Sequence, residues 1–121
     1  MYLRFQGRVP NLGTASKLGI FQLAFELRDR IDLPDYAFKE LERNLSWLKA
    51  NLKSPEILDY AGHHRAISWF KDCAKEPLER IWSIKAILED FGYPIDLIKT
   101  DKPGGLIYED GWQIVAKPRR R

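Results

Sequence analysis

The sequence predicts an α+β fold, with strands at both ends of the chain and helices between them. Residues 2–9 alternate apolar and polar side chains, residues 20–91 repeat apolar side chains every three or four positions, and residues 94–117 return to alternation. A period of two places side chains on one face of a strand, whereas a spacing of three to four places them on one face of a helix. With 121 residues, the chain can bury one core but is short for two domains.

A first strand is predicted over residues 2–9. Its apolar side chains should meet the helices and its polar side chains should face solvent, namely Leu3, Phe5 and Val9 against Arg4, Gln6 and Arg8. A first helix should follow, capped by Thr14 or Ser16 and reaching about Ile31. A second helix should begin at Asp35, a candidate cap, and end before Ser54 and Pro55.

A third helical stretch is predicted from about His63 to Phe91. Its apolar seam keeps one phase over Ile67, Phe70, Ala74, Pro77, Ile81, Ile84, Leu88 and Phe91. Pro77 lies inside this pattern and removes a backbone donor. A kinked helix and two helices that meet near Pro77 both fit, and the unbroken phase favours the kink.

Three C-terminal strands are predicted over residues 94–100, 106–109 and 112–117. Pro103 and Gly104 suit a type II turn between the first two, and Asp110-Gly111 is typical of a type I′ hairpin turn. The three strands should form an antiparallel meander, and the first strand should join it in one sheet of four strands packed on the helices.

The formal net charge is +3, and Arg119, Arg120 and Arg121 account for all of it. We therefore predict a neutral single domain over residues 1–118 and a basic tail over residues 119–121. Nucleic-acid or anion binding would rest on this tail and on three residues near the first strand, Arg4, Arg8 and Lys17. The segment from Gly7 to Lys17 lacks the lysine spacing of a P-loop, although a helix N-terminus there could bind an anion.

No convergent catalytic set is visible, so we predict no catalytic residue, no metal site and no cofactor. His63 and His64 are adjacent and cannot jointly hold a metal on one helix. Cys73 is the only cysteine and is expected to be buried and inert. The acidic residues near the turns, Asp101, Glu109 and Asp110, are expected to be structural turn residues, since an aspartate in a turn bonds local backbone amides.

Trp47, Trp69 and Trp82 lie off the main apolar stripes of the predicted helices. Large aromatic side chains in such positions either widen a core or form a contact surface for a partner. They are the candidate residues for binding a protein partner or a second copy of the chain.

Several separated segments resemble a family of small uncharacterised bacterial proteins. The segments are residues 7–14, 68–76, 87–92, 100–104, 108–110 and 113–118. The family pattern has serine at Cys73, no proline at Pro77, a larger residue at Gly105, an acidic residue at Gly111 and no arginine tail. The resemblance implies no activity, cofactor or site residue.

The leading functional hypothesis is therefore a non-catalytic module that binds a protein partner. A nucleic-acid-associated protein is the alternative, and an enzyme of unknown class comes third. No apolar run reaches the length of a transmembrane helix. Arg4 and Arg8 lie where a signal peptide would need its apolar segment, so no signal peptide is predicted. Together with the single cysteine, this predicts a cytoplasmic protein without membrane contact.

Overall fold

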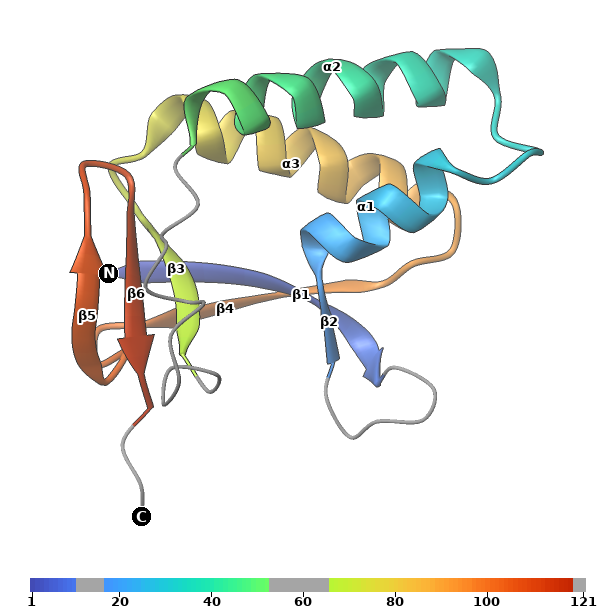
Figure 1. Cartoon of the computed structure of the whole chain (residues 1–121). Helices are drawn as coiled ribbons and strands as arrows, with labels where there is room; N and C mark the ends of the chain where they lie inside the picture. The colour runs from blue at the N-terminus through green and yellow to red at the C-terminus, as the bar shows by residue number, and fades with distance from the viewer. Residues whose placement is uncertain (11–16, 53–65, 119–121) are drawn as a thin grey trace.

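Three helices cover one side of an antiparallel sheet in the computed structural model, which describes residues 1–10, 17–52 and 66–118 (Figure 1). The strands are Tyr2–Pro10 (β1), Lys17–Gly19 (β2), Ile67–Lys71 (β3), Ile95–Thr100 (β4), Gly105–Glu109 (β5) and Gln113–Lys117 (β6). The helices are Ile20–Arg28 (α1), Asp35–Asn51 (α2) and Lys75–Asp90 (α3). The predicted α+β class with three helices is confirmed.

The sheet is organised around β1, which has three partner strands. Leu3 pairs with Phe70 of β3 and with Lys99 of β4, so these two strands lie on opposite edges of β1. Farther along β1, Gln6 pairs with Gly19 of β2, which therefore shares its edge with β3. The main order is β4-β1-β3-β6-β5. The prediction of four strands is wrong, because the described sheet has these five strands and the three-residue β2.

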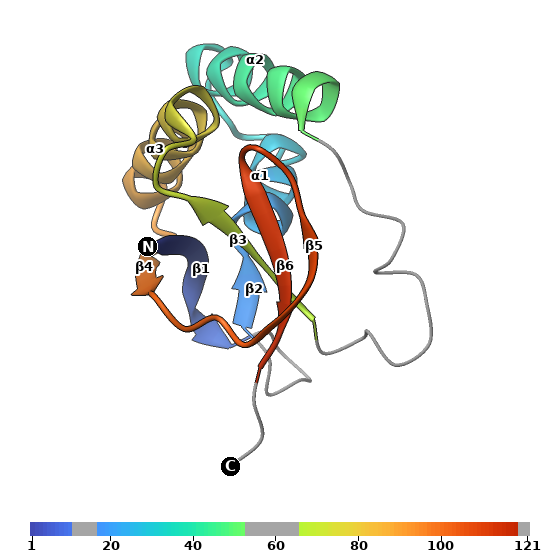
Figure 2. The same ribbon diagram turned by 90° about the vertical axis from the view of Figure 1, so that its left-hand side faces the viewer.

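The predicted three-strand meander is also wrong. β5 and β6 pair as an antiparallel hairpin, as expected, but β4 pairs with β1 and not with β5. The long β1 offers β4 six consecutive partners, from Tyr2 to Gly7, and a local turn signal cannot reveal that distant alternative. The connection at residues 101–104 instead leads from one edge of the sheet to the other. The strands twist enough for this, since β5 and β6 run steeply across the direction of β1 (Figures 1 and 2).

The kinked third helix is wrong as well. Residues 67–71 form strand β3, and α3 begins only at Lys75, with Pro77 in its first turn. A helix lacks intrahelical acceptors for its first amides, so a proline costs little there and causes no kink. β3 lies between β1 and β6 and has buried residues on both faces, Trp69 and Phe70. A central strand of this kind can imitate one turn of an apolar helix.

α1 starts later than predicted because residues 17–19 belong to β2. Its cap is Gly19, whose amide donates to the Gln22 side-chain oxygen at 3.1 Å. The proposed caps Thr14 and Ser16 lie outside the described residues. At the other end, α1 stops at Arg28, and Ile31 is fully exposed and not part of the apolar stripe. α2 spans Asp35–Asn51 as predicted, although its N-cap is Pro34 and not Asp35.

The sheet has an apolar cluster on each side. Leu3, Phe5 and Phe70 face the helices and belong to the main core. Trp69, Ile114 and Ala116 form a smaller cluster on the opposite side. β6 contributes to both sides, because Gln113, Ile114, Val115 and Ala116 are all buried. The sheet therefore does not have the single wet face that the sequence predicted.

α2 and α3 are joined by a buried amide in addition to apolar packing. Asn44 is buried, and its side-chain nitrogen donates to the Ser83 hydroxyl at 3.0 Å and to the Glu40 carbonyl at 3.0 Å. Ser83 in turn donates to the Glu40 carboxylate at 3.0 Å. These bonds fix how the two helices are aligned along their length.

Candidate functional site

The edge of β1 is unpaired between its two partners β3 and β2. The described pairing with β3 stops at Leu3, and that with β2 starts at Gln6. Arg4 and Phe5 therefore have partners only on the β4 edge, among the residues that the structure describes. Neighbouring strands normally exchange hydrogen bonds at about 4.8 Å separation, so a break in the ladder opens the layer.

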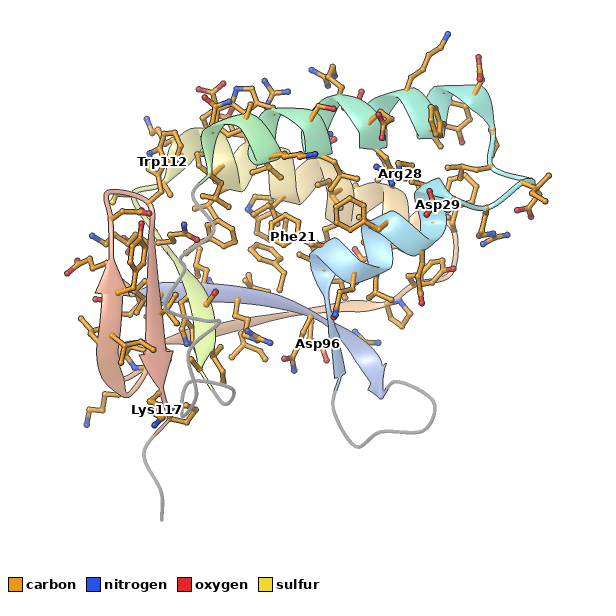
Figure 3. All side chains as sticks on the ribbon, viewed as in Figure 1. Phe21, Arg28, Asp29, Asp96, Trp112 and Lys117 are labelled. Atoms are coloured by element: carbon orange, nitrogen blue, oxygen red, sulfur yellow. The ribbon has the colours of Figure 1, made fainter. Side chains whose placement is uncertain are left out.

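A cavity of about 740 Å³ lies at this break and extends to the helices. Its wall is largely apolar and comes from β1, α1, α2 and β3, including Phe5, Ile20, Phe21, Phe25, Leu45, Leu48, Leu52 and Phe70. Figure 3 shows Phe21 extending from the start of α1 into the space between the helices and the sheet. A volume of several hundred Å³ with an apolar wall is typical of sites for small molecules.

Arg28 and Glu42 form an ion pair on the wall between α1 and α2. The Arg28 Nη1 to Glu42 Oε1 distance is 2.9 Å, and Arg28 Nε also lies 3.3 Å from Asp29 Oδ1 (Figure 3). Partial burial alone would lower the pKa of Arg28, but its hydrogen bonds to Asp29 and Glu42 raise it overall. Its charge is thus already balanced by two carboxylates.

Arg4 also lines the cavity, and no carboxylate of the described residues pairs with it. Its Nη1 is 3.4 Å from the Ser68 carbonyl oxygen, and its Nε is 3.3 Å from Gln6 Oε1. Burial lowers the pKa of Arg4, since the charged form loses hydration. Trp69 follows Ser68 in the chain, and its indole Nε1 is buried and has no hydrogen-bond partner among the residues that the structure describes. Trp69 also lines the cavity, so the cavity wall includes two residues with incompletely satisfied donor groups.

A second hollow of about 770 Å³ lies by the connection between β4 and β5. It is formed by residues 98–104 together with Ile67, Trp69 and Pro118. Trp69 is the residue that the two hollows share among the described ones. The ionisable side chains among its described lining residues, Lys99, Asp101 and Lys102, are all exposed, so its chemistry is less specific.

The three tryptophans that the sequence singled out lie in three different environments. Trp69 is only 8% exposed and belongs to the small cluster behind the sheet. Trp47 is half-buried beside Trp112, with ring centroids 5.8 Å apart, and under the Arg80 guanidinium. Trp82 is 46% exposed and packs edge-on against Phe5, with ring centroids 5.3 Å apart. The fold does not bring them together into one surface.

The predicted anion-binding residues are dispersed as well. Arg8 is exposed and paired with Asp96 at 3.0 Å, on the side of the sheet away from the helices (Figure 3). Lys17 is in β2, but its side chain lies outside the described residues, as do Arg119, Arg120 and Arg121. Arg4 is the one member of the set that reaches the cavity within the described part of the chain.

Cys73 is exposed, and the expectation that it is buried is wrong. It lies in the turn between β3 and α3, which the sequence assigned to the middle of a helix. His63 and His64 lie outside the described residues. Within the described ranges, no three histidine, cysteine or acidic residues come together in an arrangement that could hold a metal ion.

Asp110 accepts four hydrogen bonds at the β5–β6 hairpin. The donors are the backbone amides of Trp112 and Gln113 at 2.9 and 3.0 Å, the Tyr108 hydroxyl at 2.7 Å and the Gln113 side chain at 3.2 Å. The structural role predicted for Asp110 is confirmed. The type I′ turn is not, because Gly111 does not have a positive φ angle.

Sequence reasoning missed the cavity because the break between β3 and β2 depends on strand pairing. Phe21, Phe70 and Gln113 are far apart in sequence; the two phenylalanines read as ordinary core residues there, and Gln113 as a strand residue without a role. One signal was present, since Arg4 was identified as a candidate anion ligand. That Arg4, unlike the other described arginines, has no carboxylate partner among the described residues can be seen only from the contacts in the structure.

No helix in the described parts of the chain is long and apolar enough to cross a bilayer. Comparison of the chain with family models, curated proteins and solved structures finds no match. The resemblance to small bacterial proteins therefore stays a prediction.

Proposed function

We propose that this chain is a non-catalytic binding domain that holds a small, mainly apolar molecule in the 740 Å³ cavity. The cavity carries this proposal, because its volume and aromatic lining fit a ligand of that kind. Glu42 is the only carboxylate among its described lining residues, and it is engaged by Arg28. We further propose that the protein acts in the cytoplasm.

The proposal can be tested by titrating the ¹⁵N-labelled protein with 1-octanol and mapping the amide shifts. The largest shifts are expected at Phe21, Phe70 and Gln113, because these three residues come from different parts of the wall. Leu45→Phe should weaken binding, since the larger ring would occupy ligand space. Shifts confined to the exposed helix surface, or no saturable shifts, would contradict the proposal.

A second candidate function is protein binding or self-association through the α1–α2 corner. Four of the seven exposed large apolar side chains of the described residues occur here, namely Phe25, Ile31, Tyr36 and Phe38. The end of α1 and the start of α2 lie at one end of the helical layer (Figure 1). Exposed apolar side chains gathered in this way are typical of contact surfaces.

Self-association at this corner can be measured by sedimentation velocity as a function of concentration. Ile31 is fully exposed and Tyr36 is 71% exposed, so Ile31→Ser with Tyr36→Ser should abolish a dimer without changing the fold. A matched double change of exposed residues elsewhere, Lys102→Ser with Lys117→Ser, should leave the dimer intact. A monomer at all concentrations would rule out self-association. The nucleic-acid alternative gains no support from Arg8, which Asp96 neutralises.

A further inference from the structure

Arg4 differs from every other arginine that the structure describes. The other five are each within 4.0 Å of a carboxylate, namely Arg8 with Asp96, Arg28 with Glu42, Arg30 with Asp32, Arg43 with Glu40, and Arg80 with Glu76. Arg4 has no such partner among the described residues, although it is more buried than the exposed Arg8 on the same strand. A half-buried guanidinium without a counter-charge is unusual.

The contacts that Arg4 does make leave most of its hydrogen-bonding capacity unused. A guanidinium has five N–H donors, and within the described ranges only two of those of Arg4 have acceptors, both neutral. Both distances, 3.3 and 3.4 Å, are longer than the usual range for N–H···O bonds. Burial also lowers the pKa of Arg4, so its environment provides little stabilisation of the charge.

Trp69 supplies an independent observation at the same place. It is 8% exposed, its indole Nε1 has no hydrogen-bond partner in the part of the chain that the structure describes, and it lines the cavity together with Arg4. The backbone carbonyl to which Arg4 donates belongs to the preceding residue, Ser68. Buried indole N–H groups usually have an acceptor, and an acceptor brought by a ligand would satisfy this one.

We propose that Arg4 binds the oxyanion head of an amphipathic ligand, whose apolar body lies against Phe21 and Phe70 in the cavity. This inference rests on the proposed binding function and names the chemical class of its ligand. The planar guanidinium fork matches the geometry of a carboxylate or a phosphate, and Trp69 lines the same cavity with one further donor. Arg28 is a poorer candidate, because two carboxylates already occupy it.

The head group can be tested by calorimetry with three ligands of equal chain length: octanoate, octyl phosphate and uncharged 1-octanol. At least one anion should bind about tenfold more tightly than the alcohol, as expected for a charge-assisted hydrogen bond. The tighter anion shows whether the head is a carboxylate or a phosphate. Equal affinity of all three would overturn the role of Arg4 but leave the cavity proposal intact, whereas no binding at all would overturn both.

Variants assign the effect to Arg4. Arg4→Gln should remove the preference for the anion, whereas Arg8→Gln should keep it. Arg8→Gln removes the same charge from the same strand, but Arg8 does not line the cavity. If Arg4→Gln fails to fold, the comparison of the two anions with 1-octanol on the wild-type protein still tests the proposal. The indole N–H resonance of Trp69, assigned with Trp69→Phe, should shift with the anion and not with 1-octanol. An unchanged resonance with a bound anion would overturn the placement of the head group.

Discussion

Gly104, in the connection between β4 and β5, is a residue at which adding a single methyl group should destabilise the fold. Its φ angle is 114°, and a Cβ there would lie 2.0 Å from the backbone oxygen of Lys117. Neither problem can be relieved by a side-chain rotation. We expect Gly104→Ala to lower the free energy of unfolding by roughly 2 kcal/mol or more, measured by urea denaturation.

Gly105 is the matched control for this change. It is the next residue, it does not have a positive φ angle, and a Cβ there meets nothing within 4 Å. Gly105→Ala should therefore change stability by no more than about 0.5 kcal/mol. Equal losses for the two variants would show that the close approach to Lys117 is not what requires glycine.

Asp110 should make the stability of the protein depend on pH in the acid range. Burial raises the pKa of Asp110, but hydrogen bonds from Trp112, Tyr108 and Gln113 outweigh it and lower the pKa overall. A carboxylate with a lowered folded-state pKa stabilises the fold fully above the unfolded value, about 3.9, and loses this contribution as pH falls through the folded value. Wild type should therefore exceed Asp110→Asn in stability at pH 7.

The measurement is urea denaturation of both proteins between pH 7 and pH 2. The difference between them should shrink below about pH 4, because the protonated Asp110 resembles the amide in charge. A difference that stays constant over the whole range would mean that the charge of Asp110 does not contribute.

At the scale of the element, the pairing of α2 with α3 should depend on Asn44. Asn44→Ala removes bonds to Ser83 and Glu40 and leaves a small buried void, so we expect a loss of roughly 2 kcal/mol. Asn51→Ala is the control on the same helix, since Asn51 is exposed and only bonds the Trp47 carbonyl. Thermal and urea unfolding should show little change for Asn51→Ala, and a similar loss for both would contradict the role of the interface.

The elements differ in how well the sequence predicts them, for physical reasons. α2 has one apolar face and one charged face, so its period is clear, and the β5–β6 hairpin is enclosed by local turn residues. β3 has buried residues on both faces, Trp69 and Phe70, and its alternation is therefore hidden. Pro77 then seemed to interrupt a helix that in fact begins two residues earlier.

At the scale of the whole molecule, the cavity makes a prediction about packing. Leu45 lines the cavity, whereas Leu41 on the same helix is fully buried and does not. Leu41→Phe should cost about 1–3 kcal/mol through overpacking. Leu45→Phe has free space for the added atoms and should cost clearly less, as measured by urea denaturation of the free protein. Equal costs would indicate that the cavity cannot accept a side chain.

The sheet order and the cavity could not be predicted from local patterns. Which strand pairs with β1 depends on residues 60 to 100 positions away, and a hairpin signal near Pro103 pointed to the wrong partner. Arg4 could be identified as a candidate ligand from its place on the polar side of β1. That it alone lacks a carboxylate could be seen only once the whole set of described arginines was placed.

The position of β1 at the start of the chain also affects the order of folding. Leu3 needs both Phe70 and Lys99, so the centre of the sheet can form only after most of the chain has been synthesised. Until then Leu3 and Phe5 lack their cover, and closing such long loops slows folding. In a nascent chain these apolar side chains should therefore stay uncovered until β4 has left the ribosome, a period in which chaperones that hold apolar segments can bind them.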